Sequence, residues 1–248
     1  MSLIGFLAGL ATGLVLSVLG AGGSMFIVPV LVFVLHTPVS EATGTSLLIV
    51  GAAALAAAFG HWRKGNIDPK VAGIFGGAAV VGAVAGSSLH SLVSGRTLTA
   101  LFAVILFVAA GRMIWGRQVD PKTAAAPRAA ILLPLGAAIG VLSGFLGVGG
   151  GFLIVPALSL GAGLRVRQAI GTSLAVMAVS SLAGAVTQAA QGQLSLGVVA
   201  TIGGGAVIGA IAGAPLAGKL PDRPLRLGFA GLAIAVGGYM AVQAALGS

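Results

Sequence analysis

The stretch that decides the fold reads GAGGSMFIVP at residues 20–29 and recurs as GVGGGFLIVP at residues 147–156. The two copies are separated by 147 − 20 = 127 residues. The same offset, without a gap, pairs the Gly-Thr-Ser-Leu sequence at 44–47 with that at 171–174, and it continues as far as Met113 and Met240. About a third of the aligned positions from Gly13 to Met113 are identical, so the chain is a tandem duplication.

The composition around these motifs is that of a membrane protein. Of the 248 residues, 58% are hydrophobic and 7% charged, whereas soluble domains carry about 25% charged residues. Apolar runs of about 20 residues, long enough to span hydrocarbon, recur along the chain. We therefore expect an all-α polytopic membrane protein, which excludes soluble enzymes and nucleic-acid-binding proteins. The chain has no cysteine, and its sequence groups no nucleophile with a base, no paired carboxylates and no metal ligands, so we expect no catalysis, cofactor or metal.

Each repeat predicts a broken helical hairpin followed by three transmembrane helices. In the first repeat, residues 1–115, the hairpin and helices are expected at 3–35, 41–60, 70–90 and 97–115. In the second repeat, residues 129–248, they are expected at 129–164, 168–187, 196–217 and 225–246. The polar stretch 116–128 between them is predicted to be a cytoplasmic linker.

The distribution of Lys and Arg favours a hairpin over a single kinked span. Residues 3–35 would form a helix about 50 Å long, against a hydrocarbon core of about 30 Å. A single span divides the basic residues almost evenly between the two sides of the membrane. A re-entrant or fully crossing hairpin instead places all thirteen except Arg96 on one side, as the positive-inside rule requires. This topology inverts the two repeats relative to each other and leaves both termini periplasmic.

The glycine motifs are the strongest candidates for a binding site. Non-helical backbone at membrane depth is tolerated where it lines a cavity, and broken helices in inverted-repeat transporters direct helix N-termini at anionic substrates. A dinucleotide-binding fingerprint would need a preceding strand and a later acidic residue, which neither repeat offers. Close helix packing is the alternative explanation. The predicted substrate-binding backbone groups belong to Gly22, Gly23, Ser24, Gly149, Gly150 and Gly151.

Paired hydroxyls follow each hairpin at Thr45-Ser46 and Thr172-Ser173. Hydroxyls can donate to sulfonyl or carboxylate oxygens without a buried cation, and their presence in both repeats favours a substrate role. The alternative is that they donate to carbonyls of their own helices, as Ser and Thr in membrane helices often do.

Three further residues are candidates for ion coupling or gating. His61 aligns with Gln188 and precedes Trp62-Arg63-Lys64, a sequence typical of an interfacial anchor, which is the interpretation we prefer; a proton relay is the alternative. Glu41, one of four acidic residues, is placed to complement a helix dipole or to bind a coupling ion, H⁺ or Na⁺.

Taken together, the motifs resemble the TauE/SafE family of sulfite and sulfonate transporters. Besides the two doubled motifs, the resemblance includes Gly65-Asn66-Ile67-Asp68, its partner Gly192-Gln193-Leu194-Ser195, and the sequence LPDRPLR at 220–226. It implies a multi-pass carrier of the bacterial inner membrane for small sulfur-containing or organic anions such as sulfite and sulfonates.

The leading hypothesis is a secondary transporter with alternating access at a midplane site between the repeats. A gated anion channel and the permease subunit of a multi-protein importer are the alternatives. The expected partners are a small anion, a coupling ion and the lipid bilayer. Glycine-rich outer helix faces are compatible with a homodimer, and intramolecular packing explains them equally well.

Overall fold

The computed structural model describes residues 2–20, 27, 31, 37–89, 95–115, 128–146, 151–190, 192 and 194–246. Across these ranges the chain is helical and forms no strand. Among the described residues, five helices are long and apolar enough to cross a membrane: Glu41–Trp62, Pro69–Gly86, Val166–Ala190, Leu196–Lys219 and Asp222–Val242. The prediction of an all-α polytopic membrane protein is confirmed.

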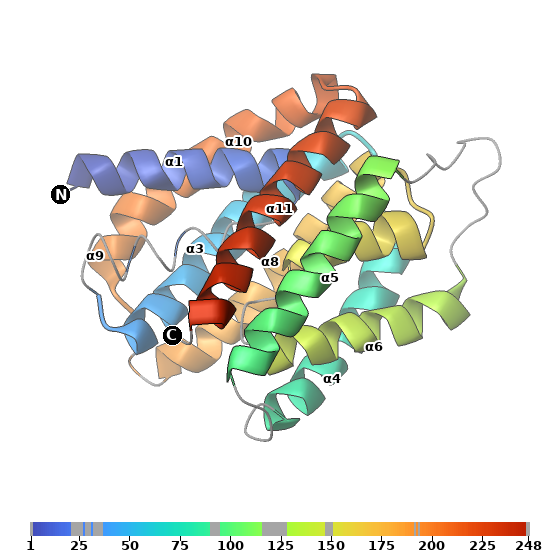
Figure 1. Ribbon diagram of the computed structural model, residues 1–248. Coiled ribbons are helices and arrows are strands. Elements are labelled where there is room, and N and C mark those ends of the chain that lie inside the picture. The colour runs from blue at the N-terminus through green and yellow to red at the C-terminus, as the bar shows by residue number, and fades with distance from the viewer. Residues whose placement is uncertain are drawn as a thin grey trace. The chain divides into compact units, whose positions relative to one another are not determined.

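The helices form two compact units that differ from the sequence repeats. Unit 1 comprises Met1–Pro69 and Ile170–Leu220, so it combines the start of the first repeat with the middle of the second. Its elements are α1 (Ser2–Leu19), α3 (Val39–Trp62), most of α8 (Val166–Ala190), the short α9 (Leu196–Val198), the π-helical turn η4 (Val199–Gly203) and α10 (Gly204–Lys219). In Figure 1, α1 lies alongside α10.

Unit 2 comprises Lys70–Ala169 and Pro221–Ser248. Its elements are α4 (Pro69–Leu89), α5 (Gly95–Trp115), α6 (Ala129–Leu146), the short α7 (Gly151–Pro156), the π-helical turn η3 (Ala157–Gly161) and α11 (Asp222–Leu246). Helices α5 and α11 pack side by side (Figure 1). Each unit therefore contains helices from both repeats.

In unit 1, glycines bring the backbone of α1 into direct contact with η4 and α10. A methyl group at Gly9 would overlap the carbonyl oxygen of Ile202 in η4, and one turn later a methyl group at Gly13 would overlap that of Ala206 in α10. Both residue numbers rise together, so the two helices run parallel. Small residues allow this close approach in membrane proteins, where packing drives helix association.

Unit 2 repeats this packing between α6 and α4. Methyl groups at Gly136 and Gly140 would overlap the carbonyl oxygens of Phe75 and Ala79. These positions are the repeat partners of the unit 1 contacts, because 9 + 127 = 136 and 75 + 127 = 202. The duplication therefore extends to individual backbone contacts, with the two repeats exchanging roles.

Repeat-equivalent helices that share a unit run antiparallel. In unit 1, Gly51 of α3 faces Leu182 of α8, and Gly184 of α8 faces Leu47 of α3. In unit 2, the start of α11 meets the end of α5, and Gly237 lies opposite Leu106. Helices with related sequences thus point in opposite directions within each unit.

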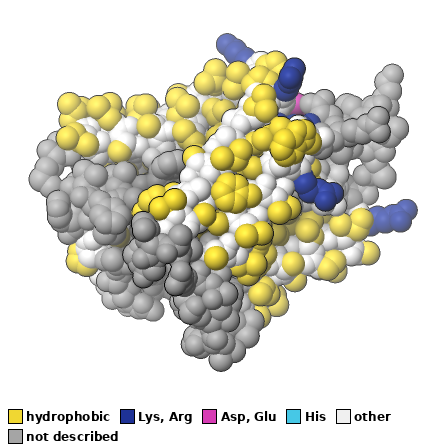
Figure 2. All heavy atoms as spheres, in the orientation of Figure 1, with side chains coloured by type: hydrophobic (Ala, Val, Ile, Leu, Met, Phe, Trp, Pro, Cys, Tyr) yellow, Lys and Arg dark blue, Asp and Glu magenta, His cyan; other side chains and the backbone are white. Residues whose placement is uncertain are grey.

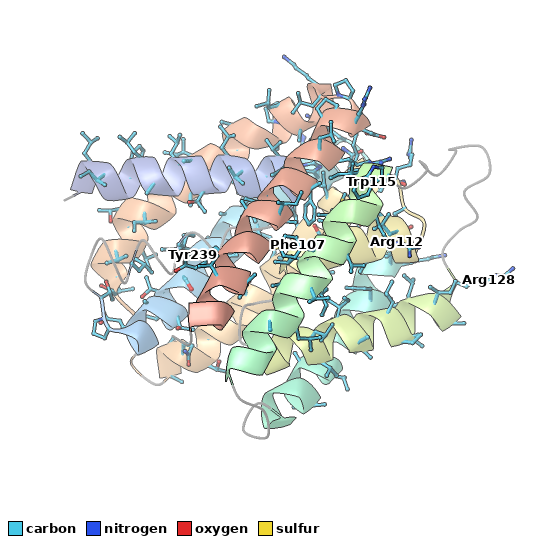
Figure 3. The ribbon with its side chains drawn as sticks, in the orientation of Figure 1. Phe107, Arg112, Trp115, Arg128 and Tyr239 are labelled. Atoms are coloured by element: carbon cyan, nitrogen blue, oxygen red, sulfur yellow. The ribbon has the colours of Figure 1, made fainter. Side chains whose placement is uncertain are left out.

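The outer faces of the helices are apolar, as expected for surfaces that meet lipid. Hydrophobic side chains cover the visible faces of α5, α6 and α11 in Figure 2, and Lys and Arg lie at the helix ends. Figure 3 shows Phe107 and Tyr239 along α5 and α11, and Arg112 with Trp115 at one end of α5. Trp115 is 84% exposed. An exposed Trp close to Arg is typical of a membrane–water interface.

Candidate functional site

The two motif threonines make reciprocal hydrogen bonds in the core of unit 1. The backbone N–H of Ser195 donates to Thr45 Oγ1 at 3.0 Å, and that of Asp68 donates to Thr172 Oγ1 at 3.1 Å. Both threonine side chains are fully buried. Asp68 and Ser195 are themselves repeat partners, 195 − 68 = 127. Each threonine therefore anchors the loop that leads into a helix of the other repeat.

The two motif serines are also buried and bonded to carbonyl groups. Ser173 Oγ lies 2.9 Å from the carbonyl oxygen of Gly20 and 2.8 Å from that of Ile170, so its hydroxyl joins α8 to the end of α1. Ser46 Oγ donates to the carbonyl of Thr43 in its own helix at 2.8 Å. The structure thus gives all four hydroxyls protein partners, while their predicted role toward a substrate remains a proposal.

Gly20 ends α1 at the position where the sequence predicts a break. Its φ is +70°, in the left-handed region that favours glycine. A Cβ atom there would also lie 2.9 Å from Ile170 Cα and 2.9 Å from Ser173 Oγ. Backbone conformation and space together require glycine at the point where the first apolar stretch leaves its helix.

Most of the predicted binding backbone lies outside the described residues: Gly22, Gly23, Ser24, Gly149 and Gly150. Gly151 is described and begins α7, and α6 ends at Leu146. The segments that follow the two glycine motifs share a backbone hydrogen bond: Thr37 N–H donates to Leu31 O, and Leu164 N–H donates to Leu158 O, each at 3.0 Å. The same backbone hydrogen bond is therefore present after the motif in both repeats.

His61 is a buried core residue, so the preferred interpretation as an interfacial anchor is wrong. Its side chain is 1% exposed, and Nε2 lies 3.1 Å from the carbonyl oxygen of Ser17 in α1. Burial follows from the close approach of three segments, since a methyl at Gly171 would overlap Asn66 O and lie 3.2 Å from His61 Cβ. The next residue, Trp62, is 63% exposed and can serve as the anchor instead.

Gln188 and Glu41 occupy less enclosed positions than His61. Gln188 is half-buried near the end of α8, and Glu41 is half-buried in the first turn of α3. The structure does not bring these two residues together with His61 into one cluster, since Glu41 and His61 lie at opposite ends of α3. Within the described segments, no group of three His, Asp or Glu residues is arranged to hold a metal ion.

Two contacts at this site are not predicted by any motif in the sequence. Ser17 accepts the His61 bond through its backbone carbonyl, and Lys64 Nζ donates to the carbonyl of Ala214 in α10 at 3.0 Å. A hydroxyl within the apolar run of α1 is the only signal that could have drawn attention to Ser17. Nothing in the sequence indicates that Lys64 folds back onto another helix.

Comparison with known proteins identifies the family. The profile of the family described as Sulfite exporter TauE/SafE matches residues 5–240. The chain belongs to this family. Relatives of this TauE/SafE protein include the Probable membrane transporter protein YdhB of Bacillus subtilis (strain 168), 31% identical over 86% of this chain and 89% of the relative. A Probable membrane transporter protein of Xylella fastidiosa (strain 9a5c) is 36% identical over 65% of this chain and 64% of its own. No solved structure matches the TauE/SafE chain. The protein is therefore a membrane transporter.

Proposed function

We propose that this TauE/SafE protein is a secondary transporter that moves small sulfur-containing or organic anions, such as sulfite and sulfonates, across the bacterial inner membrane. The family description names sulfite export, and the relatives carry names of membrane transporters. Movement of a coupling ion, H⁺ or Na⁺, drives the anion. The two repeats act as inverted halves that give alternating access to one site.

The reciprocal threonine bonds in unit 1 are the observation that carries this proposal. Thr45 of α3 accepts from Ser195, in the loop that follows α8, and Thr172 of α8 accepts from Asp68, in the loop that follows α3. Such an exchange of equivalent contacts between antiparallel helices is what inverted repeats would produce. Apart from the imidazole of His61, the polar groups around these bonds are hydroxyls and backbone dipoles. Neutral groups bind an anion weakly enough to release it, whereas a permanently charged buried cation would hold it and would cost several kcal/mol to desolvate.

In this proposal the anion binds to backbone N–H groups of the two glycine motifs, Gly22 to Ser24 and Gly149 to Gly151. The described hydroxyls have a supporting role. Ser173 holds Gly20, two residues before Gly22, and each threonine fixes the entry of a helix from the other repeat. A bulky residue in place of Gly22 or Gly150 should therefore abolish transport while the protein still inserts into the membrane.

Uptake of radiolabelled sulfite into proteoliposomes tests the proposal. A carrier gives saturable uptake, competition by unlabelled sulfonates, and counterflow, in which unlabelled anion inside accelerates entry of label. Flux that rises linearly without counterflow would instead indicate the gated channel. Flux only with a nucleotide-hydrolysing partner would indicate an importer subunit. Protein-free liposomes and the Gly22→Val variant serve as controls.

Inversion of the repeats has its own test at a pair of exposed repeat partners. Pro38 and Arg165 are both exposed and 127 positions apart. Because the chain has no native cysteine, Pro38→Cys and Arg165→Cys each create a single labelling site. An impermeant maleimide should label the first only from the periplasm and the second only from the cytoplasm. Labelling of both cysteines from the same side would show that the repeats have the same orientation and would contradict this model of transport.

A further inference from the structure

Two buried polar atoms in unit 1 lack a hydrogen-bond partner among the described residues, and they belong to residues in contact. They are Nδ1 of His61 and Oγ of Ser17. His61 is 1% exposed and Ser17 is 0% exposed. A buried polar group without a partner is costly, and native structures usually supply it with a protein group, a water or an ion. These two atoms therefore indicate that something polar binds beside them.

The bond on the other side of the imidazole defines which nitrogen can accept a proton. Nε2 lies 3.1 Å from the carbonyl oxygen of Ser17. A carbonyl can only accept, so Nε2 must carry a hydrogen and donate it. In the neutral ring the second nitrogen is then bare. Nδ1 is accordingly a proton acceptor enclosed within unit 1.

Few charged groups of unit 1 lie on the elements that pack against His61. Unit 1 presents no ionisable residue to His61 from α1 or from residues 170–190 of α8, and α10 contributes only Lys219 at its end. The remaining charged groups are Arg63 and Lys64, which directly follow α3, Asp68 in the same loop, and Glu41 at the opposite end of α3 from His61. The Lys64 ammonium donates a hydrogen bond to Ala214 O. Ser17 precedes the break at Gly20 by less than one helical turn, and the first glycine motif follows directly.

The second repeat lacks both members of this pair. The positions that correspond to His61 and Ser17 are Gln188 and Gly144, since 61 + 127 = 188 and 17 + 127 = 144. This His–Ser pair therefore occurs once in the chain, which fits a carrier that couples one proton to one substrate.

We propose that His61 binds the coupling proton of the transport cycle. This inference rests on the proposed function and names its coupling ion. The Nδ1 lone pair forms an N–H bond with a proton taken from one aqueous side, and that bond breaks when the proton is released on the other side. Nε2 keeps its hydrogen and its bond to Ser17 throughout. The imidazolium and the anion stabilise each other in the same state, so proton and anion move in the same direction.

His61→Gln separates coupling from substrate binding. Glutamine can still donate a hydrogen bond to the Ser17 carbonyl, but it cannot bind a proton, and it is the residue that the second repeat carries at this position. In proteoliposomes we expect wild-type counterflow of labelled sulfite and loss of pH-gradient-driven accumulation, so that the accumulation ratio falls to about one. The double variant His36→Gln, His90→Gln is the control, because it removes the two other histidines and keeps His61, and it should leave both activities unchanged.

The outcomes distinguish this inference from the proposed function. Absence of counterflow in the wild-type protein would count against the transporter itself. Normal counterflow without any response to a pH gradient would leave the transporter standing and overturn the role of His61. Full gradient-driven accumulation in His61→Gln would overturn it as well. Loss of both activities in a correctly inserted variant would make His61 a structural residue.

A second measurement does not depend on transport or on substitution of His61. In a variant with His36→Gln and His90→Gln, His61 is the only histidine. Histidine ¹⁵N NMR of this protein in detergent should show a protonated Nε2 and a bare Nδ1 at high pH, with Nδ1 gaining its proton as the pH falls from about 9 to 5. An Nδ1 that stays unprotonated over this range would refute the proposal.

Discussion

The helix pairs α1–α10 in unit 1 and α6–α4 in unit 2 use the same contacts with different tightness. In both pairs, glycines place backbone against backbone at positions 127 residues apart. The pairs differ at one end: a methyl at Gly86 would overlap the carbonyl oxygen of Val141, whereas a methyl at its partner Gly213 would lie 3.0 Å from that of Leu14. The two repeats therefore share the contact, but they differ in the space that it leaves for a methyl group.

Pro215 provides a physical reason for this difference. It lies inside α10, two residues after Gly213, and the corresponding residue of α4 is Ser88. Proline removes a backbone hydrogen bond and bends a helix, so the end of α10 is less closely held against its partner. Helix α10 is also preceded by the π-helical turn η4, while residues 72–76 of α4 are regular α-helix.

We expect the largest loss of stability from adding a methyl group at the tighter contact. Gly86→Ala forces α4 away from α6, since backbone cannot move aside as a side chain can, and should cost about 3 kcal/mol of stability. Gly213→Ala should cost about 1 kcal/mol. Unfolding by SDS in mixed micelles measures both. Gly77→Ala and Gly204→Ala are the controls, because a methyl at either glycine meets no atom within 4 Å. Equal losses at Gly86 and Gly213 would show that Pro215 does not loosen the pair.

The reciprocal threonine bonds should, in contrast, be equivalent in the two repeats. Thr45→Val and Thr172→Val each leave a partly buried backbone N–H without its acceptor, so each should cost about 1–3 kcal/mol. The two losses should agree because the bonds measure 3.0 Å and 3.1 Å.

Thr12→Val is the matched control for this pair. The Thr12 hydroxyl donates only to Ala8 O of its own helix, at 2.7 Å, and such bonds add little stability. Sulfite uptake by the same variants shows whether the two threonines also affect substrate binding. A markedly unequal loss of stability would mean that one of the two threonine bonds contributes more to the stability of unit 1 than the other.

The sequence predicts those features that are repeated or periodic. The apolar runs predict the helices, and the doubled motifs predict both the break at Gly20 and the importance of Thr45 and Thr172. The exchange of helices between units depends on contacts between residues far apart in sequence, such as Gly9 with Ile202, and no local pattern specifies them. Burial of His61 was misjudged for a related reason: the neighbouring Trp62, Arg63 and Lys64 are typical of an interface, while the packing of α1 and Gly171 against the ring is invisible in the sequence.

The smallest expected effect concerns a contact without a counterpart in the first repeat. In unit 2, Arg226 Nε donates to the carbonyl of Met113 at 2.7 Å and Nη2 donates to that of Ile114 at 3.3 Å, which satisfies free carbonyls at the end of α5. Its repeat partner is Thr99. Arg226→Ala should lower stability by about 1 kcal/mol, since the half-buried guanidinium is partly screened by water.

Arg223→Ala is the control for this contact, because Arg223 is exposed one turn earlier on α11. It removes the same charge from the same end of the helix and should be neutral. Thermal unfolding of the detergent-purified variants compares the two. Equal destabilisation would assign the effect to the helix dipole and the general field of basic residues, whereas a loss confined to Arg226 would establish that a specific cap holds the α5–α11 pair.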